Sequence, residues 1–288
     1  MGVDGEKAPV ETIVGILDSS VRTIKEEAFE GCKNMKICLM HDQVESIERY
    51  AFVDCSAMKS IRLSQQLKHI GYESFGFCES LDALFIPPST TKIDHRAFVG
   101  CRNIRILHLP DDINIEELGV GIMKDCSTFF EKSQVEEYHA LNGCLIINNE
   151  EVHQSILAFY RNLSPLHRIC LDTNVTEQRI HQCINLHGLT SAFTTDHNEM
   201  TPLHILAMNP YATPGTILRC FHLNKSAVFS KDNSEMTPIQ YLKNHENVER
   251  LISLIHALCL HREARLQGKR PRHPRTHYKG SYRIVLRP

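Results

Sequence analysis

The chain has 288 residues, enough for one large domain or two ordinary ones, and its 42% hydrophobic content suits a folded protein. Residues 1–150 carry 15 Lys and Arg against 24 Asp and Glu, whereas residues 151–288 carry 17 against 10, so two modules of opposite charge are expected. No apolar run reaches the ~18–20 residues of a membrane span, and no secretory signal is visible at the start. We therefore expect a cytoplasmic protein, with the nucleus as the alternative location, whose 11 cysteines are reduced thiols.

After a leader (residues 1–12) that we expect to be flexible, the sequence repeats every 23 residues. Six columns of each copy are apolar. They include Phe29, Phe52, Phe75 and Phe98 in one column and Cys32, Cys55, Cys78 and Cys101 in another. Apolar residues two apart, as in Ile61 and Leu63, indicate a short strand with one buried face. A single coil has too little core to fold alone, so the copies must stack. A fifth copy with two extra residues follows, and residues 13–128 are expected to form one β-solenoid.

The third copy runs from Ile70 through Gly71, Phe75 and Cys78 to Pro87, and it resembles the BspA-like leucine-rich repeat. This resemblance implies a curved solenoid that recognises proteins or other large ligands, and it implies no catalytic residue.

The cysteine column has two interpretations. Stacking would bring neighbouring alpha carbons within the distance range of a disulfide. Alternatively, a small and weakly polar side chain suits a tight inward turn. We favour the architectural interpretation, because the spacing follows the coil and not a ligand geometry.

Between the inward columns, alternate residues are expected to face outward from one strand of each coil. This outward strip is the predicted partner-binding site, and an apolar strip of this kind often marks a contact. It consists of Ile37, Leu39, Ser60, Arg62, Ala83, Phe85, Ile106 and His108. Two alternatives remain open, namely that another part of the chain covers the strip or that it is ordinary surface. If the strip is free, Phe85→Ala should weaken binding and leave stability nearly unchanged.

Residues 129–163 break the period and are predicted to be a helical connector, because Val152, Ile156, Leu157 and Tyr160 fall on one helix face. A looser repeat follows, with the starts Ser164-Pro, Thr201-Pro and Thr237-Pro. Ser or Thr before Pro starts a helix, since the hydroxyl caps free N–H groups and Pro fits the first turn. Each start precedes a second amphipathic segment, so residues 164–266 are expected to be an all-α array of helix pairs.

The stretch from Thr201 to Ala207 resembles the ankyrin repeat, while the stretches at Ser164 and Thr237 match less well. The resemblance implies a second protein-binding array, with His167 and His204 bonded to loop backbone. Glu199 and Glu235 replace the turn glycine of the repeat, and such glycines take a positive φ that other residues adopt reluctantly. We therefore expect the usual turn to be altered.

Residues 267–288 form a basic tail. It could bind nucleic acid, act as an import signal, be a plain solubilising end or fold onto the acidic half.

Metal and catalytic motifs are missing from the sequence. The candidate metal ligands are Cys183 with His181 and His187, Cys220 with His222, and Cys259 with His261, but none has the paired spacing typical of structural zinc. No phosphate loop, dinucleotide fingerprint or nucleophile elbow occurs. No cofactor or metal is expected.

The sequence thus predicts an α+β repeat protein, in which a leucine-rich-repeat β-solenoid precedes an ankyrin-like helical array. The expected function is a non-enzymatic scaffold that binds a protein partner through the solenoid surface. The alternative is a nucleic-acid-associated regulator that uses the basic tail.

Overall fold

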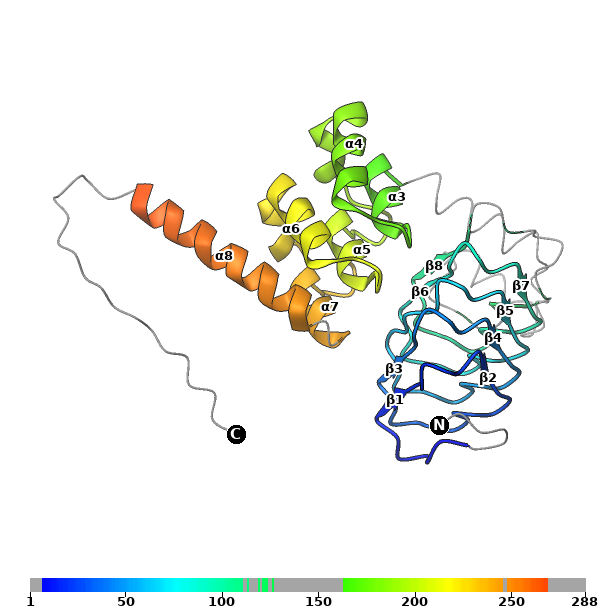
Figure 1. The fold of residues 1–288 in the computed structure, drawn as a ribbon. Coiled ribbons are helices and arrows are strands. Elements are labelled where there is room, and N and C mark those ends of the chain that lie inside the picture. Colours follow the sequence, from blue (N-terminus) through cyan, green and yellow to red (C-terminus); the bar gives the residue numbers. More distant parts are fainter. Residues whose placement is uncertain are drawn as a thin grey trace, which may run out of the picture.

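The computed structural model describes residues 7–110, 113, 119, 121–123, 126, 163–245 and 248–268. A β-solenoid occupies the N-terminal part and a helical array the C-terminal part, and the two lie side by side (Figure 1). The predicted connector helix lies outside the described residues, as does the tail beyond Gly268.

The described residues of the solenoid form three parallel sheets. One face carries the four-stranded sheet β2-β4-β5-β7, with one strand from each of four successive coils. The other face carries the pairs β1-β3 and β6-β8. The strands of the first face are β2(Thr23–Ile24), β4(Ser46–Ile47), β5(His69–Ile70) and β7(Lys92–Ile93). Those of the second are β1(Val14–Ile16), β3(Ile37–Leu39), β6(Ala83–Phe85) and β8(Ile106–His108). Partners in the register, such as Val14 with Ile37, lie 23 positions apart, which confirms the period.

The repeated phenylalanines stack along the solenoid axis. Their ring centroids lie 5.0 Å apart for Phe29 and Phe52 and 5.2 Å apart for Phe52 and Phe75. These values are close to the ~4.8 Å spacing of neighbouring strands. Phe98 continues the stack at 5.9 Å, so a column of aromatic rings runs through the interior of four successive coils.

The helical array consists of three helix pairs in two rows. The first row contains α3(Pro165–Leu171), α5(Pro202–Met208) and α7(Pro238–Asn244), and the second contains α4(Glu177–His187), α6(Pro214–Leu223) and α8(Val248–Gly268). The 3-10 helices η2(Leu189–Ala192) and η3(Lys225–Phe229) follow the first two pairs. The predicted starts are confirmed. Ser164 accepts a hydrogen bond from the N–H of His167, and Thr237 accepts one from the N–H of Gln240.

The turns before α5 and α7 correct one prediction. Glu199 and Glu235 take positive φ values of 57° and 59°. The glutamates therefore adopt the backbone conformation for which the repeat uses glycine, and the expected change of the turn does not occur at these residues. Asp196 compensates, because its Oδ1 accepts hydrogen bonds from the N–H groups of Asn198 and Met200. Asp232 repeats this pattern. Two bonds to a carboxylate offset the ~1–2 kcal/mol cost of a left-handed residue.

Candidate functional site

The outward strip on the β1-β3 and β6-β8 face is exposed at one end and buried at the other. Leu39 is 53% exposed, whereas Phe85 is 1% exposed and Ile106 is fully buried. Ser60, Arg62 and His108 are intermediate. One half of the strip, from Ala83 to His108, is therefore mostly interior. In the other half Leu39 is exposed, and Ile37, Ser60 and Arg62 are partly exposed.

The burial of Ala83, Phe85 and Ile106 corrects the expectation that they face solvent. All three belong to the buried cluster of the helical array and not to the solenoid core. In Figure 1, β6 and β8 lie at the end of the solenoid beside α5, and β1 and β3 lie farther along. The alternative that another part of the chain covers the strip thus holds for this half.

The free half contains two residues that the sequence reasoning missed. Val14 and Ile16 on β1 are exposed, and they lie beside Ile37 and Leu39 in the parallel register. Four outward apolar side chains therefore form one patch, which we call the β1-β3 patch. The signal was available, because Val14 and Ile16 stand 23 positions before Ile37 and Leu39.

A buried polar network holds the two modules together. Nη1 of Arg105, from the solenoid, donates to Oδ2 of Asp232 at 2.9 Å and to the hydroxyl of Ser234 at 3.1 Å. Nη2 of Arg105 donates to the hydroxyl of Tyr241, which itself donates to Asp232. The guanidinium also lies over the Tyr241 ring, 5.2 Å from its centroid. Asp232, Ser234 and Tyr241 of the helical array thus all bond to Arg105 of the solenoid.

Hydrogen bonds and charge pairing together outweigh burial in this network. Burial works against the charged forms of both Arg105 and Asp232. Tyr241, Asp82 and Asp232 nevertheless raise the pKa of Arg105, while Tyr241, Met236 and Arg105 lower the pKa of Asp232. Both residues thus carry their charges at neutral pH, and they form an ion pair within a largely buried interface.

Two further contacts extend the junction on either side. The hydroxyl of Tyr211 donates to the carbonyl oxygen of Leu63 at 2.8 Å, and Arg62 packs over its ring. His245 Nε2 lies 3.2 Å from a carboxylate oxygen of Asp82. A cavity of about 290 Å³ adjoins the junction, and its lining includes Lys59, Asp82, Arg105 and Tyr241.

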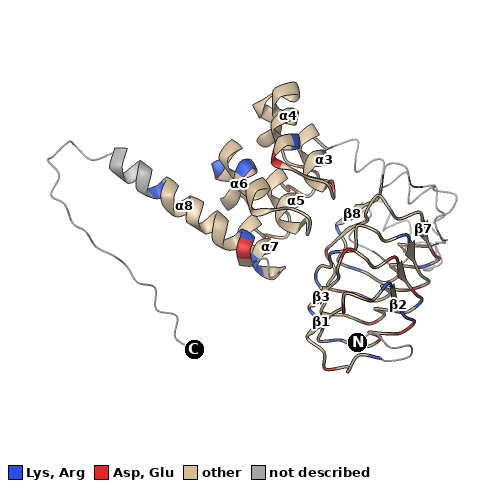
Figure 2. Ribbon diagram, in the orientation of Figure 1, with Lys and Arg blue, Asp and Glu red and all other residues tan. Residues whose placement is uncertain are grey.

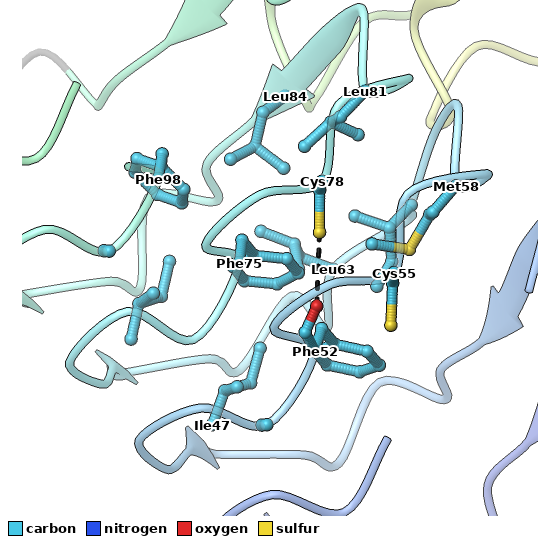
Figure 3. Packing of buried hydrophobic residues seen from close by; sticks show 14 of the residues in the cluster. Ile47, Phe52, Cys55, Met58, Leu63, Phe75, Cys78, Leu81, Leu84 and Phe98 are labelled. Carbon is cyan, nitrogen blue, oxygen red and sulfur yellow. Dashed lines mark hydrogen bonds between the residues drawn. The ribbon is translucent and has the colours of Figure 1, made fainter. Parts of the chain in front are cut away.

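The cysteine column is part of the architecture. Sγ of Cys78 donates to the carbonyl oxygen of Phe52 at 3.2 Å (Figure 3). Cys55 and Cys101 make the equivalent bonds to Phe29 and Phe75. Each thiol thus joins one coil to the coil before it. The residues just before these cysteines, such as Asp54 and Phe77, take positive φ values that turn the chain inward.

The histidines behave as the sequence predicted at two positions. Nε2 of His167 lies 2.9 Å from the carbonyl oxygen of Met200, and that of His204 lies 3.1 Å from the carbonyl oxygen of Met236. Both imidazoles thus join one helix pair to the turn of the next. Cys183 and Cys220 are buried structural thiols, and the described residues contain no group of three or more His, Cys, Asp or Glu that could hold a metal ion.

Comparison with known proteins identifies the solenoid. Residues 11–130 match the family model of the BspA type leucine rich repeat region in six copies. A search of curated proteins found no match to the chain. In the part of the chain that the structure describes, no helix is long and apolar enough to cross a membrane.

Three solved structures illustrate the similarity. A leucine rich cell surface protein from Faecalibacterium prausnitzii is 26% identical, with a TM-score of 0.38, over 45% of this chain and 36% of its own. A leucine-rich repeat protein from Bacteroides ovatus is 20% identical, with a TM-score of 0.36, over 42% of this chain and 39% of its own. A leucine rich repeat protein from T. pallidum is 26% identical, with a TM-score of 0.37, over 46% of this chain and 72% of its own. The chain therefore spans well under half of the first two proteins.

Proposed function

We propose that this protein, whose residues 11–130 are a BspA-type leucine-rich repeat region, is a non-enzymatic scaffold that binds a protein partner through the β1-β3 patch. Leucine-rich repeat solenoids serve mainly in protein recognition, and this one presents a surface suited to that role. The four residues of the patch lie on adjacent strands, and three of them are more than 40% exposed.

The single observation that supports this site is the contrast between the two halves of one strip. Where the helical array covers the strip, the outward residues Ala83, Phe85 and Ile106 form a dry core. The equivalent residues of β1 and β3 have the same apolar character and no cover from the described residues. Aliphatic groups exposed together in this way favour association, at roughly 25 cal/mol per Å² removed from water.

We also propose that the helix pairs are ankyrin-type repeats. The Ser/Thr-Pro starts, the repeated His bonds to Met200 and Met236 and the left-handed Glu199 and Glu235 support this assignment. The turn at Asp232 and helix α7 contact the protein's own solenoid, so this array contributes to the scaffold by fixing the solenoid at one end. No disulfide joins any of the ten described cysteines, and we propose an intracellular location on this ground.

Affinity capture of the tagged protein from its own cells tests the proposed partner site. The variant Ile16→Asp/Leu39→Asp places two carboxylates in the β1-β3 patch. The matched control is Leu186→Asp, which changes an equally apolar residue that is 79% exposed on α4. We expect the proteins enriched by the wild type to be lost from the double variant and retained by the control. Retention of the same proteins by the double variant, with its fold intact by circular dichroism, would contradict the assignment.

A further inference from the structure

The second row of the helical array carries a surface that the solenoid does not use. Helix α8 presents four apolar residues to solvent, namely Val248, Ile252, Ile255 and Leu260, each between 45% and 62% exposed. Beside this stripe, α6 and α8 enclose a groove of about 330 Å³. Its lining contains the apolar residues Leu218, Ala257 and Leu260 and the polar residues His222, Lys225 and His256.

The inner side of α8 is firmly held, so its outer side is a stable surface. Leu254 is fully buried in the array, and Arg250 is 5% exposed. Nη1 of Arg250 donates to the carbonyl oxygen of Asn209 at 2.6 Å, just beyond the last turn of α5. A cation at the negative end of a helix is favourable, although burial lowers the pKa of Arg250 to about 10.

The lining of the groove has one sign of charge. It contains Lys225 with His222, His256 and His261, and no Asp or Glu. In Figure 2 the middle of α8 is uncharged, and Lys and Arg mark α6 and the far part of α8. Two glutamates flank this middle part of α8, since Glu249 stands next to Val248 and Glu263 follows Arg262.

We infer that the groove between α6 and α8, with the adjacent α8 stripe, docks an acidic amphipathic helix of a partner protein. A groove between two helices accepts the apolar face of a third helix, with side chains spaced at i, i+3 or i+4 and i+7. Glutamates on the flanks of that helix would face Lys225 and the imidazoles of His222 and His256 in the groove lining. An isolated exposed ion pair contributes little free energy to binding. The apolar contacts therefore supply most of the affinity, and the charges supply selectivity.

Charge also selects this occupant over two others. A second copy of the same surface would bring like charges together across the interface. Residues 269–288 of the chain itself contain seven Lys and Arg and no Asp or Glu, so they suit the groove poorly. This interface is independent of the β1-β3 patch, since it lies on the other module and on different residues.

Fluorescence anisotropy with two synthetic peptides tests the inference on the full chain. Both peptides have the same leucine stripe on a 16-residue helix, and one carries Glu and the other Lys on the flanks. We expect the Glu peptide to bind, with an affinity that falls as salt rises, and the Lys peptide to bind much more weakly. Leu260→Asp should lower the affinity for the Glu peptide by about tenfold or more, because a carboxylate replaces an apolar residue of the groove lining.

Matched variants separate the groove from general charge effects. Lys225→Glu should weaken binding of the Glu peptide, whereas Lys33→Glu on the solenoid and Leu186→Asp on α4 should leave it unchanged. Equal binding of both peptides, or binding of the Glu peptide that survives Leu260→Asp, would overturn the inference, the latter by pointing to the basic tail. Sedimentation supplies another check. A dimer of the free protein that Leu260→Asp dissociates would assign the groove to a second copy and equally overturn it.

Discussion

The guanidinium of Arg105 lies 2.9 Å from the carboxylate of Asp232, although 127 positions separate the two residues in the chain. Asp232 is fully buried at its side chain and Arg105 is only 14% exposed there. This pair joins the residue just before β8 to the turn before α7. Together with Tyr241 it contributes to a junction that also contains the Tyr211–Leu63 and His245–Asp82 contacts.

Removal of this guanidinium should destabilise the protein strongly. We expect Arg105→Ala to lower the free energy of unfolding by about 3 kcal/mol or more, because it leaves a buried carboxylate without its charge partner. Arg102→Ala removes an exposed arginine from the same coil and should cost at most ~1 kcal/mol. Urea denaturation of both variants checks this. Equal midpoints for the two would show that the junction contributes nothing to stability.

Truncation of Phe85 should destabilise the protein far more than truncation of Leu39, although both residues occupy equivalent outward positions of their coils. Phe85→Ala should cost about 3–5 kcal/mol, since the ring is 1% exposed within the array's buried cluster. Leu39→Ala should change stability by less than ~0.5 kcal/mol, because its side chain is half exposed. Thermal unfolding measures both effects. A stable Phe85→Ala variant would mean that the helical array does not cover this half of the strip in solution.

The described thiols should differ sharply in reactivity. Nine are buried and Cys259 is exposed, and burial raises the pKa of Cys38 to about 12. Because the thiolate is the reactive form, a maleimide applied briefly to the native protein should modify Cys259 before any of the other nine. Peptide mapping by mass spectrometry reads out the order. Early modification of Cys55 or Cys78 would show that the solenoid opens readily.

Stability of the helical array should fall as the pH falls below about 6.5. Burial lowers the pKa of both His167 and His204 from 6.5, so folding favours the neutral imidazoles. Their contribution is complete above pH 6.5 and is lost as the pH falls through the folded-state values. In His204, protonation of Nδ1 would also remove the bond that it accepts from the N–H of Thr201.

Melting temperatures between pH 7.5 and pH 5 measure this dependence. The variant His204→Gln keeps a donor for the carbonyl oxygen of Met236 and removes the titrating group. It should therefore show a smaller loss of stability in acid than the wild type does. An identical slope for the two proteins would mean that His204 does not contribute to it.

Much of the fold follows from local pattern. The 23-residue spacing of Phe29, Phe52, Phe75 and Phe98 determines a stack of coils, because each side chain needs its equivalent in the next coil as a neighbour. The hydroxyl-Pro pairs at Ser164, Thr201 and Thr237 determine where helices begin, since capping depends only on residues three positions away. The turn at Glu199 was predicted wrongly because the Asp196 carboxylate accepts two hydrogen bonds that stabilise a backbone disfavoured by propensity alone.

The sequence by itself thus determined two repeat arrays and which side of each strand faces outward. Only the tertiary structure decided which outward residues remain free. A periodic pattern gives Leu39 and Phe85 the same position in their coils, and it contains no information about what lies against them. That difference arises because apolar residues of the helical array, which is bonded to the solenoid through Arg105, Asp232 and Tyr241, form one buried cluster with Phe85, whereas Leu39 stays 53% exposed.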